Sequence, residues 1–273
     1  MSSYQTVLLD IRDNAAYITF NRPEKRNCMS PTLHAEMVKV LDEIDRARVK
    51  VIVITGAGDA FCAGMDLEGC FLEPFDKPDL MAEINKNAFG WFTRMKNHSA
   101  VTIGKVNGWC FGGGMALAGV LDIVLVAEES TWGLSEVNFG IFPGGGTTWA
   151  YANNMPSRKK ALYYALTGET FTGKQAEDMG YATKSMPLAE LDAETDRVVK
   201  MLTRLGRTVL AKTKEVYEKV RWMDFEAAID YEMAKLWELS RETNDDWVRT
   251  ALASFKRREF KPGTQAYTLT KDV

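Results

Sequence analysis

Apolar and polar residues alternate at the start of the chain, and further along the apolar residues recur with the spacing of a helix. Strict alternation over residues 7–11 and 16–20, with a polar turn between them, predicts a β-hairpin. Ser30 and Pro31 form a helix-start signal. The helix predicted to follow carries apolar side chains on one face, namely Leu33, Met37, Val40, Leu41 and Ile44. Since the continuous apolar run 51–54 then predicts a buried strand, the order of elements predicts an α/β fold.

The middle of the chain continues this exchange of strands and helices. Apolar runs at residues 100–103 and 122–127 predict two further strands, and a helical pattern covers 80–95. Residues 69–78 carry two prolines and mixed charges without any period. That composition predicts a mobile segment over a site.

The last third of the chain has a different pattern. From residue 156 onward no strand signal is found, whereas helical patterns extend over 188–220 and 225–255. Residues 172–175 form a capping box, and Gly180 is a predicted helix stop. We therefore expect a helical layer at the C-terminal end.

Two glycine-bearing loops are the candidate chemical features. Residues 106–116 include the consecutive glycines 112–114 between a predicted strand and a predicted helix of small residues. Such a turn leaves backbone N–H groups free at the first turn of the helix, where they can hold a negatively charged oxygen. A tight turn without a ligand is the alternative. A second loop, residues 61–67, contains Gly64.

Composition narrows the class of protein. With 273 residues, 46% hydrophobic and 26% charged, the chain is long enough for one large domain with or without an appendage. The net charge of −3 comes from 34 basic and 37 acidic residues without charged blocks, so we expect neither nucleic acid nor a membrane as partner. The N-terminus lacks a signal-peptide pattern and no apolar run could span a membrane, which predicts a cytoplasmic protein.

Cysteine and histidine are sparse. The four cysteines, Cys28, Cys62, Cys70 and Cys110, have irregular spacing that predicts reduced thiols and no zinc site. There are only two histidines, His34 and His98. We therefore expect no bound metal, and we expect acid/base chemistry to come from carboxylates or tyrosines.

Several motifs in order carry a family resemblance. They are residues 21–27, 63–67, 107–114, 134–136 and 140–145. Together they resemble the crotonase (enoyl-CoA hydratase/isomerase) superfamily over about residues 7–261. Residues 21–33 and 106–114 are most similar to the hydroxycinnamoyl-CoA (feruloyl-CoA) hydratase-lyases within it.

The resemblance implies a fold, an assembly and a substrate class. It implies a crotonase-like spiral of ββα units over residues 1–200 and a C-terminal helical trimerisation region over 201–273. Members assemble as homotrimers or homohexamers and act on acyl-CoA thioesters. No separate cofactor is implied, because coenzyme A enters as part of the substrate.

The resemblance also implies the catalytic groups. The backbone N–H groups of Met65 and Gly113 would hold the thioester oxygen, and Glu136 would transfer the proton. Fixed donors of this kind contribute about 3–4 kcal/mol each to stabilising an enolate-like oxygen. From the residues alone, Met65 is equally compatible with an apolar contact and Glu136 with a surface charge.

The implied substrate-binding positions extend along the whole chain. They are Lys25, Ala63, Asp66, Cys70, Phe71, Gly112, Gly114, Ala116, Trp132, Gly144 and Tyr231. Lys25 and Arg26 would meet the phosphates of coenzyme A, or else they are solvated charges. Aromatic residues at 109, 111, 132, 139, 142 and 149 would form the acyl pocket, or else an aromatic core.

Three positions depart from the family pattern. Ala116 stands where hydratases carry a second glutamate and the hydroxycinnamoyl enzymes a serine. Cys70 and Phe71 occupy the region of a phenol-binding tyrosine, and Tyr231 is a shifted substitute for a second one. We therefore expect hydration of an aromatic enoyl-CoA, either ending there or followed by retro-aldol cleavage to an aldehyde and acetyl-CoA. A single-carboxylate isomerase and a non-catalytic thioester-binding subunit are the alternatives.

Overall fold

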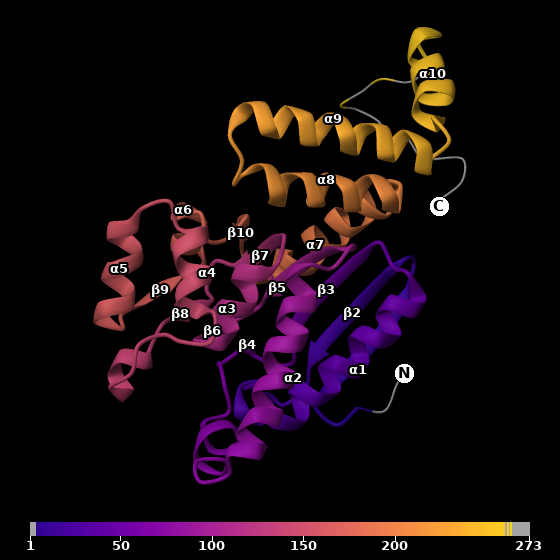
Figure 1. Ribbon diagram of the computed structural model, residues 1–273. Helices are drawn as coiled ribbons and strands as arrows, with labels where there is room; N and C mark the ends of the chain where they lie inside the picture. Colours follow the sequence, from indigo (N-terminus) through magenta and orange to yellow (C-terminus); the bar gives the residue numbers. More distant parts are fainter. Residues whose placement is uncertain (1–3, 260, 262, 264–273) are drawn as a thin grey trace.

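A six-stranded sheet forms the centre of the protein (Figure 1). The computed structural model describes residues 4–259, 261 and 263. The strand order is β1-β2-β3-β5-β7-β10. The strands are β1 (Val7–Arg12), β2 (Ala15–Phe20), β3 (Val51–Gly56), β5 (Val101–Val106), β7 (Ile123–Ala127) and β10 (Lys184–Met186). Only the β1–β2 pair is antiparallel in this sheet, and the other pairs are parallel.

The predicted N-terminal elements are confirmed. Asp13 and Asn14 both have positive φ, 49° and 62°, which is the backbone of a tight two-residue hairpin turn between β1 and β2. Helix α1 (Pro31–Ala47) begins at Ser30, whose hydroxyl accepts from the Leu33 N–H. All five side chains of its predicted apolar face are buried.

A second, smaller sheet has the order β4-β6-β8-β9. It contains β4 (Ala60–Cys62), β6 (Trp109–Phe111), β8 (Thr131–Gly133) and β9 (Thr170–Thr172). The chain alternates between the two sheets and then forms a helix, three times in succession. These units are β3-β4-α2 (Pro78–Lys96), β5-β6-α3 (Gly113–Val120) and β7-β8-α4 (Thr147–Asn154). This repetition is the ββα spiral that the family resemblance implied.

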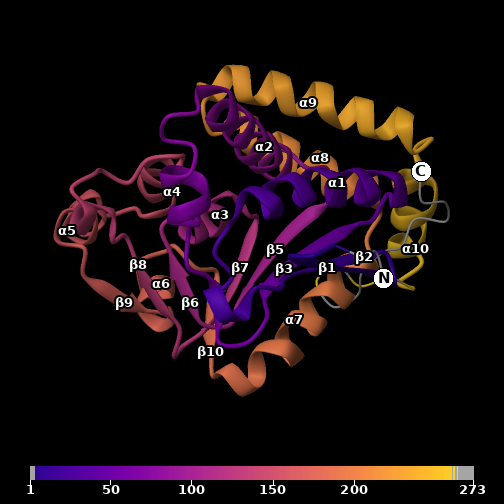
Figure 2. The ribbon, with the colours of Figure 1, turned by 90° about the horizontal axis from the view of Figure 1, so that it is seen from below.

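Helices cover both faces of the central sheet (Figure 2). Ile52 and Ile54 of β3 pack into the larger core, to which α1 and α2 also contribute. The alternate residues Val51 and Val53 face the opposite side, where α7 (Leu188–Thr203) covers the sheet. Because both faces are covered, the strand reads as a continuous apolar run.

The C-terminal third is helical but not free of strands. After residue 156 the chain forms α5 (Arg158–Thr167), α6 (Gly173–Asp178), α7, α8 (Arg207–Val220), α9 (Phe225–Glu242), a π-helical turn (Trp247–Leu252) and α10 (Ala253–Lys256). The expectation that strands are absent here is wrong, since β9 and β10 also lie in this part. Each has three residues and is held by pairing with β8 or β7, so its own sequence carries no period to detect.

Smaller sequence signals are also met in the structure. Thr172 and Gln175 form the predicted capping box of α6, and Gly180 has a positive φ of 80° just after it. Residues 69–78 are not wholly irregular, because Glu68–Leu72 form a π-helical turn. None of the helices described is both long and apolar enough to cross a membrane.

Candidate active site

The first glycine loop is held by the chain that precedes α1. Met29 and Met65 form a parallel bridge in which the Met29 N–H donates to the Gly64 carbonyl (2.8 Å) and the Asp66 N–H donates to the Met29 carbonyl (3.0 Å). In such a bridge the intervening residue directs its own N–H to the opposite side. The Met65 N–H therefore points away from Met29, and it has no acceptor within residues 4–259, 261 and 263.

The second glycine loop approaches the first one closely. Gly112 and Gly64 have positive φ values of 46° and 99°, a backbone that glycine adopts without strain. A Cβ atom placed on Gly64 would lie 3.4 Å from the Gly113 nitrogen, and one placed on Gly113 would lie 3.6 Å from the Met65 nitrogen. The two nitrogens thus lie on facing stretches of main chain. Gly113 is the first residue of α3, where its N–H has no partner inside the helix.

Glu136 lies against this pair of loops. It begins the short 3₁₀ helix Glu136–Phe139, and its Oε1 lies 2.9 Å from the position that a Cβ atom on Gly112 would occupy. Its Oε2 is buried and has no hydrogen-bond partner in the described part of the chain. Burial raises the pKa of this carboxyl above its ordinary value of 4.5. A carboxyl group able to take up and release a proton is therefore placed beside the two backbone N–H groups.

Polar contacts fix the loops around this site. The buried Asn27 amide donates to the carbonyls of Ala57 (2.8 Å) and Ala60 (2.7 Å), which ties the loop before α1 to the turn between β3 and β4. Arg22 forms a 2.8 Å ion pair with Asp66. Burial alone would raise the pKa of Asp66, but the hydrogen bond from Arg22 helps to lower it below its usual value. The bridge to Met29 and the Arg22–Asp66 ion pair therefore fix the loop that contains Met65.

The profile of the enoyl-CoA hydratase/isomerase family matches residues 10–260. The chain belongs to this family. It is accordingly an enzyme of acyl-CoA chemistry, and the crotonase resemblance is confirmed. It is 38% identical to the hydroxycinnamoyl-CoA hydratase-lyase of Pseudomonas fluorescens, over an alignment that covers 98% of this chain and 99% of that protein.

More distant relatives differ in the substrates that their names give. The chain is 28% identical to mevalonyl-coenzyme A hydratase of Aspergillus fumigatus, covering 92% of this chain and 87% of that protein. Human enoyl-CoA hydratase domain-containing protein 3 has a similar structure, with a TM-score of 0.83, 25% identity, and coverage of 94% and 99% of the two chains. An enoyl-CoA hydratase of Bacillus anthracis shares the crotonase fold, with a TM-score of 0.85, 22% identity, and coverage of 98% and 100%.

Two of the positions that depart from the crotonase pattern lie next to the two glycine loops. The Cys70 side chain is buried and its thiol donates to the Met29 carbonyl at 3.4 Å. Burial raises the pKa of this thiol to about 12, so it stays protonated. Ala116 lies in the first turns of α3 and is buried, whereas Phe71 is 45% exposed on the π-helical turn.

Trp132 and Tyr231 do not join this group in the structure. Trp132 is fully buried, its indole N–H donates to Ser130 Oγ (2.8 Å), and its ring stacks on Phe171, so its side chain lies in the core of the chain. The Tyr231 hydroxyl donates to Glu215 (3.1 Å) across the α8–α9 pair. Within one chain Tyr231 is thus part of the C-terminal helices, because α9 packs on α8 there.

The other aromatic side chains do not form a single pocket. Trp109 stacks on Phe111 with ring centroids 5.0 Å apart, and Arg26 lies 4.2 Å above the Trp109 ring. Exposed side chains follow in the 3₁₀ helix, the loop after it and α4, namely Phe139, Phe142 and Trp149. Phe111 of the first pair directly precedes the triple glycine in the chain.

The remaining predicted binding positions lie on the loops. Lys25 is exposed at the end of the turn Pro23–Lys25, and the Ala63 N–H donates to the Arg26 carbonyl at 2.9 Å. Gly114 continues α3, where a Cβ atom would lie 2.3 Å from the Cys62 carbonyl oxygen. Gly144 is exposed in the loop before α4.

One buried polar residue near the candidate site is not predicted by any sequence motif. Tyr151 of α4 is 3% exposed and its hydroxyl, like Glu136 Oε2, is buried without a partner among the residues described. In the sequence it stands in a helical segment of ordinary composition. The only available signal was a tyrosine on the inward face of α4, next to Ala150.

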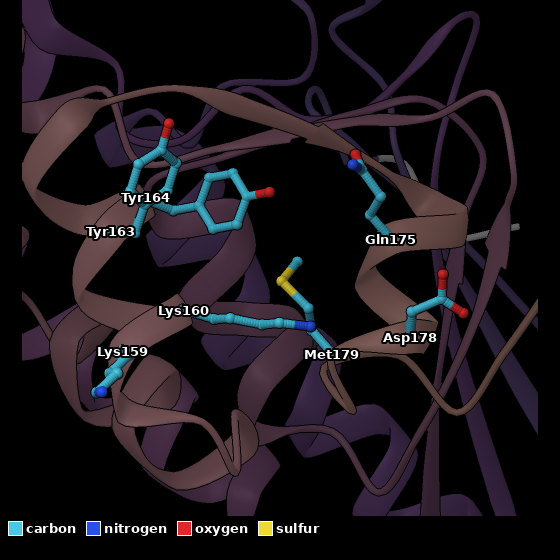
Figure 3. A pocket seen from close by; sticks show the side chains of 7 residues that line it. All are labelled: Lys159, Lys160, Tyr163, Tyr164, Gln175, Asp178 and Met179. Carbon is cyan, nitrogen blue, oxygen red and sulfur yellow. The ribbon is translucent and has the colours of Figure 1, made fainter.

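A separate hollow of about 430 Å³ lies between α5 and α6 (Figure 3). It is lined by Lys160, Tyr163 and Tyr164 from α5 and by Gln175 and Asp178 from α6. The residues that line it include neither Glu136 nor the glycine loops. It is therefore distinct from the candidate active site.

Proposed function

We propose that this protein adds water across the double bond of an enoyl-CoA thioester whose acyl group is aromatic, of the hydroxycinnamoyl type. The observation that carries the proposal is the close approach of the main chain at residues 64–65 and 112–113 beside the Glu136 carboxyl. The N–H groups of Met65 and Gly113 would donate to the thioester oxygen, and Glu136 would transfer the proton.

The reaction can be derived from these groups. Ionised Glu136 takes a proton from water as the water oxygen bonds to the β-carbon. The electron pair of the double bond moves onto the thioester oxygen, where the N–H groups of Met65 and Gly113 stabilise the enolate. Glu136 then returns the proton to the α-carbon. The raised pKa of Glu136 makes its carboxylate a stronger base, which accepts the proton more readily from water.

The choice of acyl group rests on similarity. The relative from Pseudomonas fluorescens is named for hydroxycinnamoyl-CoA and is 38% identical over nearly the whole of both chains. A phenolic oxygen would not meet a tyrosine at position 70, where this chain has a buried cysteine. Cleavage that depends on a gripped phenolate is therefore expected to be slower than hydration.

Product analysis tests the proposal. The protein is incubated with feruloyl-CoA and, separately, with crotonyl-CoA in water enriched in oxygen-18, and the products are identified by mass spectrometry. Labelled 3-hydroxyacyl-CoA from feruloyl-CoA supports aromatic hydration, and vanillin with acetyl-CoA shows that cleavage follows. Turnover of crotonyl-CoA alone would overturn the aromatic assignment. If neither thioester is turned over, the remaining interpretation is a non-catalytic subunit that binds thioesters.

An isomerase is the second candidate, and Ala116 favours it. A single carboxyl group can carry a proton from one carbon of the acyl chain to another without the help of a second one. A 3-enoyl-CoA substrate in water enriched in oxygen-18 separates the two activities. Migration of the double bond without uptake of solvent oxygen would favour the isomerase over the hydratase.

Coenzyme A binding and assembly complete the proposal. The exposed Lys25 and Arg26 would meet the phosphates of coenzyme A, which would enter only as part of the substrate. Residues 201–273 would mediate a homotrimer or homohexamer. The exposed apolar side chains Trp222, Phe225 and Trp237 on and beside α9 support this, because such a face is normally covered. The cytoplasmic location expected from the sequence remains a prediction.

A further inference from the structure

Three buried side-chain polar atoms lack a hydrogen-bond partner in the described ranges: His34 Nε2, Glu136 Oε2 and the Tyr151 hydroxyl. His34 belongs to the core between α1 and α2, where its Nδ1 accepts from the Trp91 indole at 2.9 Å. The other two belong to elements that contact α3: Glu136 Oε1 lies against Gly112 at its start, and Tyr151 lies on α4, which packs on α3. Since a buried group without a partner destabilises the folded state by about 1–3 kcal/mol, a pair of them beside the candidate site calls for a role.

The packing of α4 on α3 fixes the position of Tyr151. The Asn154 amide of α4 donates to the Gly119 carbonyl of α3 at 2.9 Å, and Ala150 lies close against Gly119. The Tyr151 ring contacts the Tyr181 ring, whose hydroxyl donates to the Met115 carbonyl at 2.7 Å. Tyr151 is therefore held on the side of α3 that carries Met115 and Gly119.

Electrostatics connect this tyrosine with the candidate acid/base. Burial is the main reason that the pKa of Tyr151 is raised, and the charges of Tyr164 and Glu136 raise it further. The hydroxyl thus stays protonated and can act as a hydrogen-bond donor.

We propose that the Tyr151 hydroxyl orients Glu136 by donating through one water molecule to its buried Oε2, so that Oε1 faces the reacting water. This inference rests on the proposed function. Tyr151 is a positioning residue. The reaction remains balanced as derived above, because Tyr151 keeps its proton throughout.

The first test is Tyr151→Phe in the whole protein, assayed with the enoyl-CoA that the wild type turns over. We expect kcat to fall about ten- to a hundredfold, the range for a lost hydrogen bond to a charged group, with KM changed less than about twofold. We also expect a Tm close to that of the wild type, because the bridging water molecule can still donate to Glu136 Oε2 when the hydroxyl is absent. A lower Tm would assign the hydroxyl to folding and overturn the proposal.

The second test is a double-mutant cycle with Glu136→Gln. If Tyr151 acts through the Glu136 carboxylate, Tyr151→Phe changes the residual rate of Glu136→Gln by less than about twofold. An equal loss in both backgrounds would contradict the proposal. If Glu136→Gln by itself leaves hydration intact, the proposed function fails first, so the two failures are distinguishable.

Two tyrosines serve as matched controls. Tyr163 is exposed and its hydroxyl donates to Glu169, so Tyr163→Phe should leave kcat and Tm unchanged. Tyr181 is as buried as Tyr151 but is hydrogen-bonded, so Tyr181→Phe should lower Tm. Wild-type kcat in Tyr151→Phe would overturn the proposal whatever the controls show.

Discussion

Two glutamates with buried carboxyl oxygens show opposite ways of using such a group. Glu36 of α1 is 8% exposed, and its oxygens accept from the Gln5 N–H (2.7 Å), the Thr6 N–H (2.9 Å) and the Thr6 hydroxyl (2.5 Å). Glu136 also buries an oxygen, but Oε2 has no partner among the residues described. The first carboxylate is satisfied by donors, and the second is not.

The difference separates a structural carboxylate from a reactive one. The hydrogen bonds that Glu36 accepts from Gln5 and Thr6 fix the N-terminal segment to α1. Burial raises the pKa of Glu136 more than the hydrogen bond from its own backbone N–H lowers it, so the energies of its two protonation states are brought closer together. The number of donors therefore tells more about the role of a buried acid than its burial does.

The largest expected effect is on catalysis at Glu136. Glu136→Gln removes the proton acceptor but keeps the shape, so we expect kcat for hydration to fall about 10³-fold. Glu36→Gln should leave kcat of the folded protein unchanged. Steady-state kinetics with feruloyl-CoA measure both variants. Equal losses in the two would erase the distinction between them.

A smaller effect is expected when the space beside Glu136 is filled. Gly112→Ala adds a Cβ atom 2.9 Å from Glu136 Oε1 at a residue with φ of 46°. Since this displaces the carboxyl group and distorts the turn, we expect a loss of about 10² in kcat. The measurement is the initial rate of hydration.

The matched control is Gly180→Ala. Gly180 has a similar left-handed backbone, with φ of 80°, but lies after α6 beside Pro156. Its substitution should cost about 1–2 kcal/mol of stability and leave kcat unchanged. If both variants lose activity alike, backbone strain and not the position of Glu136 explains the loss.

Next in size is the effect of Glu36→Gln on stability. An amide in place of the carboxylate turns one acceptor into a donor that faces the donors of Gln5 and Thr6. We expect a loss of about 1–3 kcal/mol in the free energy of unfolding, measured by urea denaturation. A variant as stable as the wild type would show that these hydrogen bonds contribute nothing net.

The sequence was sufficient for the elements whose signals are local. The hairpin at Asp13 and Asn14, the start of α1 at Ser30 and the capping box of α6 each depend on a few neighbouring residues. Strands β9 and β10 were not predicted, because a three-residue strand that pairs with a distant strand carries no hydrophobic period of its own.

The candidate site shows the same limit. Glycines 112–114 predict that the main chain comes close to a neighbouring group there, and the motif around Glu136 predicts a catalytic acid. That Oε2 of this acid and the Tyr151 hydroxyl are both buried without partners depends on how α4 packs on α3. Residues 150 and 119 are 31 positions apart, and no spacing rule connects them.

The smallest expected effect is on the stability of Glu136→Gln as the pH changes. The folded protein holds the pKa of Glu136 above 4.5, so ionisation at neutral pH costs folding free energy. We therefore expect Glu136→Gln to have a higher Tm than the wild type at pH 7. Below about pH 4 the carboxyl is protonated in both the folded and the unfolded chain, and the difference should vanish. Scanning calorimetry of both proteins measures the gap, with the exposed Glu83→Gln of α2 as control. A gap of the opposite sign would mean that Glu136 is stabilised by donors as Glu36 is, and the contrast between the two carboxylates would be lost.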